Sequence, residues 1–141
     1  MFFTESISQR LFSLGGMDSA RARRFTRLGW AAAAVTLLAG MVLQVQDHGG
    51  GWLALGFALM PDLGLLAGID RNLEKGQLAP RAVPIYNALH RLIGPLALAA
   101  LVLSGVLPPV WLSAAFGWAL HIGIDRAVGY GLRGSDGFQR S

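Results

Sequence analysis

Two aspartates and two histidines lie inside stretches of sequence that are otherwise apolar: Asp62, His90, His121 and Asp125. An ionisable side chain at the centre of a bilayer costs roughly 2.5–3.5 kcal/mol, so such a residue needs a partner or a task. Imidazole and carboxylate together form a ligand set that Zn²⁺, Mn²⁺ and Fe²⁺ accept. These four residues are therefore the candidate ligands of a divalent-metal site.

The local sequence supports this interpretation. His121 and Asp125 are four residues apart, so on a helix both side chains lie on one face and reach one ion from adjacent turns. Pro61 directly precedes Asp62 and should kink its helix, freeing backbone carbonyls. Asp62 is also a candidate catalytic base, because a carboxylate beside a metal can hold the attacking water.

Four other side chains should orient the ligands or the substrate. Tyr86 and Asn87 share a helical face with His90, Trp118 belongs to the stripe of His121, and Arg126 is either an anion contact or a topology charge. Arg91 is the predicted catalytic cation, which would offset developing negative charge.

Three alternatives use the same residues. In a structural lock, Asp62 pairs with Arg91, and Asp125 pairs with Arg126 or His121. In a proton or ion relay, the acids and histidines titrate along a path through the bundle. In a haem protein, the histidines are axial ligands, although an adjacent Asp makes an unusual haem wall.

The composition predicts that these residues are held by membrane-spanning helices. Of the 141 residues, 53% are hydrophobic and 14% are charged. Four apolar stretches have the length of a span of about 20 residues, and they cover residues 28–45, 51–69, 83–107 and 110–131. The Pro108–Pro109 pair suits a tight reversal. We expect an all-α, integral membrane four-helix bundle with up-down-up-down topology.

Counting along these spans places the four candidates at a similar depth. With a rise of about 1.5 Å per residue, Asp62 and His90 lie roughly 10 Å inside the bilayer from the same end. His121 and Asp125 lie at roughly 13 and 7 Å by the same count. Neighbouring helices would therefore present all four side chains to one plane, around an internal site.

The basic residues predict the orientation. They precede the first span, separate the second from the third, and follow the fourth, so both termini should be cytoplasmic. Residues 1–27 form a cytoplasmic segment, whose first 16 residues are predicted to be an interfacial amphipathic helix that closes at Gly15–Gly16. Residues 28–131 form the membrane domain, and residues 132–141 a cytoplasmic tail. The spread of basic residues does not fit a nucleic-acid groove.

The chain resembles a family of short bacterial four-helix membrane proteins catalogued only as a domain of unknown function. The residues that carry the resemblance are PDLGLLAG (61–68), YNALH (86–90) and LHIGIDRAVGYGLR (120–133), with GF at 137–138. A more distant similarity is to membrane-bound metal-dependent hydrolases. The resemblance implies a bacterial inner-membrane location and a shared polar site.

The leading hypothesis is an inner-membrane protein with a Zn, Mn or Fe site that hydrolyses a lipid-like substrate entering from the inner leaflet. The absence of cysteine excludes disulfides, iron–sulfur clusters and thiolate ligands. Besides the relay and the haem protein, a further hypothesis is a structural accessory subunit that binds a membrane-protein partner.

Overall fold

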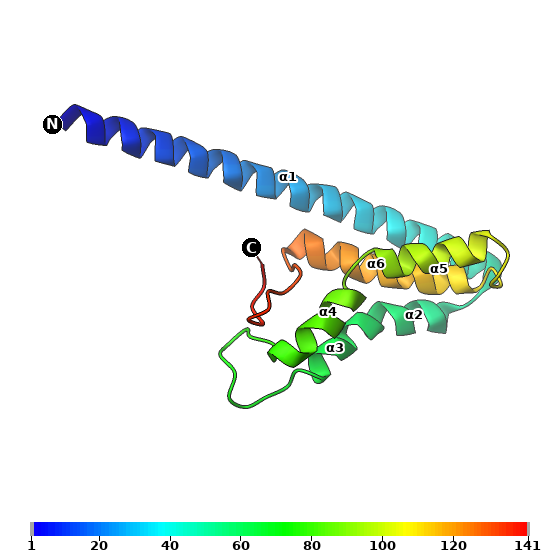
Figure 1. The fold of residues 1–141 in the computed structure, drawn as a ribbon. Helices are drawn as coiled ribbons and strands as arrows, with labels where there is room; N and C mark the ends of the chain where they lie inside the picture. The colour runs from blue at the N-terminus through cyan, green and yellow to red at the C-terminus, as the bar shows by residue number, and fades with distance from the viewer. Residues whose placement is uncertain (1, 141) are drawn as a thin grey trace.

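The computed structural model describes the backbone of residues 2–140 and the side-chain environment of residues 18–140. Within the described residues the regular elements are helices, and one isolated bridge joins Arg133 to Gln139. The prediction of an all-α fold is therefore confirmed. Figure 1 shows the course of the chain from the N-terminal helix to the C-terminal tail.

The first helix, α1 (Phe2–His48), is much longer than the predicted first span. It runs without a break through Gly15–Gly16, so the predicted end of a separate interfacial helix at these glycines is wrong. A helical glycine costs only about 1 kcal/mol relative to alanine, which a continuous helix tolerates. The predicted amphipathic face of residues 1–16 lies outside the residues whose side chains are described.

The second apolar stretch is interrupted at the predicted proline. It forms α2 (Gly51–Leu59), the short 3₁₀ helix η1 (Met60–Asp62) and α3 (Leu63–Leu66). Pro61 lacks an N–H group, so the regular hydrogen-bond ladder cannot continue through it. The interruption leaves Asp62 at the end of η1.

The third apolar stretch is also broken, which the sequence interpretation as one span missed. A 3₁₀ turn, η2 (Pro80–Ala82), leads into α4 (Val83–Leu89), and α5 (Ile93–Leu103) follows after a break at residues 90–92. The physical reason is Pro95, whose ring conflicts with the carbonyl four residues earlier and whose nitrogen donates no hydrogen bond. His90 is the first residue of this break.

The last helix, α6 (Trp111–Val128), packs against α1, α2 and α5 (Figure 1). Its close approach to α2 depends on Gly117, which lies directly against the backbone carbonyl of Ala54. Gly129 ends the helix with a φ of 98°, a conformation that favours glycine. The chain then turns back as a short tail.

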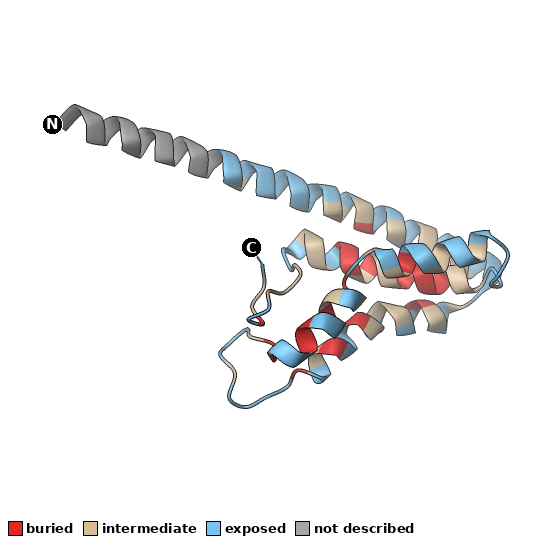
Figure 2. Cartoon of the chain, in the orientation of Figure 1, coloured by how far each residue is buried: buried red, intermediate tan, exposed pale blue. Residues whose placement is uncertain are grey.

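Two segments, Asp18–His48 and Pro80–Leu103, are long and apolar enough to cross a membrane. Only 6% and 17% of their most apolar windows are buried within the chain. Buried residues gather where the helices meet, whereas much of the outer surface of α1 and α5 is exposed (Figure 2). Apolar surface on this scale needs cover from outside the chain.

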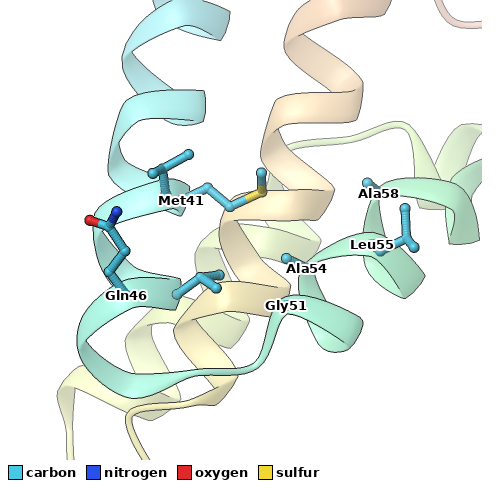
Figure 3. A pocket seen from close by; sticks show the side chains of 8 residues that line it. Met41, Gln46, Gly51, Ala54, Leu55 and Ala58 are labelled. Atoms are coloured by element: carbon cyan, nitrogen blue, oxygen red, sulfur yellow. The ribbon is translucent and has the colours of Figure 1, made fainter.

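One hollow in the fold is almost entirely apolar, with Gln46 as the one polar side chain among the residues that line it. It has a volume of about 330 Å³ and lies between the C-terminal end of α1 and α2, where Met41, Ala54, Leu55 and Ala58 line it (Figure 3). No ionisable side chain reaches this hollow. It therefore offers no group for chemistry, in contrast to the region described next.

Candidate metal centre

The four predicted ligands come from three separate places in the fold, and the structure brings them together. Asp62 ends η1, His90 occupies the break between α4 and α5, and His121 and Asp125 lie one turn apart on α6. Each break in the helices thus supplies one residue to the cluster. The unbroken helix α6 supplies the other two.

The donor atoms of the cluster lie close to one another. His90 Nε2 is 3.3 Å from His121 Nε2, and Asp125 Oδ2 is 3.4 Å from His90 Nε2 and 3.6 Å from His121 Nε2. Asp62 Oδ1 is 3.6 Å from His121 Nε2 and 3.8 Å from His90 Nε2. The donors of Asp62, His90 and His121 all lie within 4.8 Å of one another.

These separations fit ligands arranged around one ion. Donors bonded at about 2.0–2.2 Å to a tetrahedral ion are about 3.3–3.6 Å apart. The five separations that involve a histidine nitrogen, 3.3–3.8 Å, need a contraction of only a few tenths of an ångström to match that spacing. Asp62, His90 and His121 form the group in which all donor atoms are mutually close. The donor set, two imidazoles and two carboxylates, is one that Zn²⁺, Mn²⁺ and Fe²⁺ accept.

The tautomer of His90 follows from its backbone contact. Its Nδ1 lies 2.8 Å from the carbonyl oxygen of Tyr86. Since a carbonyl only accepts hydrogen bonds, Nδ1 must carry the proton, and the lone pair of a neutral ring is then on Nε2, facing the cluster. The Tyr86 ring stacks on the imidazole at 3.9 Å between centroids. Such contacts hold a metal-binding histidine in its productive orientation.

Two side chains from α6 stabilise the break that holds His90. Trp118 Nε1 donates a hydrogen bond to the Leu89 carbonyl at 2.7 Å, and Arg126 Nη2 donates to the His90 carbonyl at 3.1 Å. In a continuous helix these carbonyls would accept from the amides four residues later. Trp118 and Arg126 therefore position the break that holds His90, through hydrogen bonds to its carbonyl groups.

Asn87 positions the C-terminal tail, which the sequence interpretation treated only as a cytoplasmic extension. Its Nδ2 donates to the Arg133 carbonyl at 2.9 Å, and its Oδ1 accepts from the Arg133 amide at 2.8 Å. The Arg133 guanidinium lies 5.0 Å from the centre of the Tyr86 ring and donates to the carbonyls of Gly76 and Gly137. Sequence reasoning missed Arg133. Its only signal was its place in the GLR segment of the family-like motif.

Arg91 does not join the cluster. It is exposed, and within residues 18–140 it makes no hydrogen bond or ion pair. Because neighbouring residues on a helix do not face each other, the exposed Arg91 side chain lies on a different side of the chain from the buried His90. The predicted pairs Asp62–Arg91 and Asp125–Arg126 are likewise not formed, since both carboxylates contact imidazoles instead.

The cluster is closed on one side and open on the other. The side chain of His90 is 2% exposed, that of His121 12%, that of Asp125 20% and that of Asp62 54%. Asp62 and Asp125 border a cavity of about 340 Å³. The rest of its lining consists of Leu65, Tyr86, Tyr130, Arg133 and Gln139. A small molecule in this cavity would meet the carboxylates first.

The structure thus describes an all-helical protein that has two helices long and apolar enough to cross a membrane and a group of His and Asp side chains that could hold a metal ion. These features do not specify an activity. The chain belongs to the family described as Domain of unknown function (DUF4260), whose profile matches residues 27–141. The predicted membership of a family catalogued only as a domain of unknown function is thus confirmed. The match covers the whole cluster and the tail. No curated protein and no solved structure matches the chain, and the distant resemblance to metal-dependent hydrolases gains no support.

Proposed function

We propose that the chain is a multi-pass protein of the bacterial inner membrane that binds one divalent transition-metal ion and hydrolyses a lipid-like substrate. The single observation that carries the proposal is the convergence of two imidazoles and two carboxylates from three elements, in which each carboxylate lies within 3.8 Å of both imidazole Nε2 atoms. Mutually close ligand atoms from distant parts of a chain are what a metal site requires.

The membrane setting accounts for the exposed apolar surface. The four apolar stretches cross the bilayer in up-down-up-down order, with both termini in the cytoplasm as the distribution of basic residues favours. The breaks at Pro61 and His90 then lie within protein, where their free backbone groups find partners. Discontinuous helices that meet inside a membrane domain commonly build ligand sites.

The ligands divide by their exposure. His90, His121 and Asp125 are the least exposed and form the fixed part of the site. Asp62 is half exposed at the cavity and is the group placed to hold a water molecule or to accept its proton. A bound divalent ion would activate that water and polarise the bond to be cleaved. Tyr86 keeps His90 in the correct tautomer and orientation.

The geometry favours a single ion over haem. Two axial histidines approach haem iron from opposite faces, so their nitrogens are about 4 Å apart with the porphyrin plane between them. Here the two Nε2 atoms are 3.3 Å apart, and Asp125 Oδ2 lies within 3.6 Å of both. A carboxylate therefore occupies the region in which the macrocycle would have to lie.

Metal analysis of the detergent-purified full chain tests the proposal. Wild type should bind about one equivalent of Zn²⁺, Mn²⁺ or Fe²⁺ and lose it as the pH falls through the histidine range, because protonated imidazole does not bind metal. His121→Ala should lose the stoichiometric metal. The matched control is His48→Ala, since His48 is exposed at the end of α1 and lies outside the cluster.

The contrary result is equally clear. A wild-type protein with less than about a tenth of an equivalent after reloading with each metal would remove the proposal, since protein Zn²⁺ sites normally bind too tightly to be washed out. The cluster would then be an imidazolium–carboxylate lock, and chelator would leave the melting temperature unchanged.

A further inference from the structure

A second hollow, of about 580 Å³, lies between α1, the C-terminal end of α6 and the tail. Four arginines line it: Arg23 and Arg27 from α1, Arg126 from α6, and Arg140 from the tail. No acidic residue lines it. We call this hollow the arginine pocket.

The positive charges of the arginine pocket have no ion-pair partner in the part of the chain whose side chains are described. Within residues 18–140, none of its four guanidinium groups has a carboxylate partner within ion-pair distance. Four cations drawn from three segments into one hollow repel one another, and an anion between them relieves that repulsion. Guanidinium groups bind phosphate through paired N–H donors, which makes phosphate the anion that this donor set suits best.

One of the arginines is held by hydrogen bonds to the fold, and a second lies close to the end of α6. Arg126 donates to the carbonyls of His90 and Tyr130, each at 3.1 Å. The guanidinium of Arg27 lies against Gly129, the residue that ends α6, where a Cβ atom would collide with it. A solvated topology charge needs no such hydrogen bonds. The placement of Arg126 therefore indicates a built wall of the pocket, and exposed Arg27 lies beside it.

The surroundings favour an amphiphile over a soluble anion. Trp30 and Tyr130 also line the arginine pocket, and these aromatic side chains suit the boundary between headgroups and hydrocarbon. A phosphate held by the arginines would thus lie beside two aromatic side chains of the kind found at the headgroup level of a membrane.

The arginine pocket also adjoins the cavity at the cluster. The two share Tyr130 and Gln139 in their walls, and Arg126 links them because it lines the pocket and bonds to the carbonyl of His90. We propose that the arginine pocket binds the phosphate group of an anionic membrane lipid. Resting on the proposed function, this names the substrate class of the metal centre: a phosphate-bearing lipid whose headgroup lies beside the cluster.

Lipid binding to the detergent-purified full chain tests this proposal, with native mass spectrometry as the readout. The probes are phosphatidic acid and phosphatidylcholine with identical acyl chains. The test variant is Arg23→Gln/Arg27→Gln, and the control is Arg21→Gln/Arg24→Gln, which removes two exposed charges from the same stretch of α1 that do not line the pocket. The test variant should bind phosphatidic acid about tenfold more weakly than wild type, and the control should stay within about twofold of wild type.

Equal losses of phosphatidic acid affinity in the two variants would overturn the proposal. They would mean that any positive charge near the membrane contributes to binding, whether or not it lines the pocket. Inorganic phosphate at millimolar concentration should displace little lipid, and full displacement would overturn the assignment to a lipid.

Metal content measured on the same samples keeps this proposal distinct from the metal centre. A metal-free wild type that still shows the tenfold difference would support the phosphate pocket while removing the proposed metal chemistry.

Discussion

The first half of α6 packs through small side chains against the backbone of α2, whereas the second half presents His121 and Asp125 to the two helix breaks. Ser113, Ala114 and Gly117 are buried in the first half, and Gly117 lies against the Ala54 carbonyl. The comparison shows that one helix serves two purposes. Packing of the first half on α2 requires small side chains. The role of the second half in the cluster requires the nitrogen and oxygen donor atoms of His121 and Asp125.

The largest expected effect is on stability and falls in the first half. Gly117→Ala places a Cβ atom against the backbone carbonyl of Ala54, which cannot move aside as a flexible side chain would. We expect a loss of about 3 kcal/mol or more in the free energy of unfolding, the upper end of overpacking costs. Thermal unfolding in detergent measures it.

Gly56→Ala is the matched control for this substitution. Gly56 lies in α2 with nothing within 4 Å of the position of an added Cβ. Alanine there should be neutral or stabilising by up to about 1 kcal/mol, because it has the higher helix propensity. Equal destabilisation by the two substitutions would contradict the difference between the halves of α6.

A smaller effect is expected where the second half supports the break at His90. Trp118→Phe keeps an aromatic ring but removes the N–H group that bonds to the Leu89 carbonyl at 2.7 Å. We expect a cost of about 1–2 kcal/mol in unfolding and a loss of about tenfold in metal affinity, as is typical when a group behind a ligand is removed.

Trp52→Phe is the control for this prediction, because Trp52 is 87% exposed. It should change neither quantity. If Trp118→Phe lowered stability but left metal affinity unchanged, Trp118 would serve packing alone. It would then belong with the first half of α6 and not with the half that supports the metal centre.

The smallest effect concerns the tail. Asn87→Ala removes both hydrogen bonds to the Arg133 backbone. Amide hydrogen exchange in residues 132–138 should become about tenfold faster, while global unfolding changes little, because local opening is governed by few contacts. Asn72→Ala is the control, since only the backbone amide of exposed Asn72 is hydrogen-bonded. Unchanged exchange in the tail would mean that Asn87 does not anchor it.

The sequence was most informative where a helical count was enough. The rise per residue placed Asp62, His90, His121 and Asp125 at one depth, and the structure brings all four together. The break at Pro61 also followed from local chemistry. The predicted depth depends only on the number of residues from the end of a helix, so an error of a few residues in the helix boundaries changes it little.

The sequence was least informative where a contact joins distant segments. Pro95 was the available signal for the break at His90, which the interpretation of residues 83–107 as one span missed. The docking of Arg133 on Asn87 spans 46 positions in the chain and depends on how the tail turns after Gly129. Neither composition nor periodicity encodes such a contact.

X-ray absorption at the zinc edge tests the central claim most directly. Wild-type protein loaded with one equivalent of Zn²⁺ should show a first shell of four nitrogen and oxygen atoms at about 2.0–2.2 Å. The outer shells should require two imidazole rings per zinc, contributed by His90 and His121. A spectrum that requires one imidazole or none, or that shows six oxygen neighbours, would contradict a metal centre built on the two histidines.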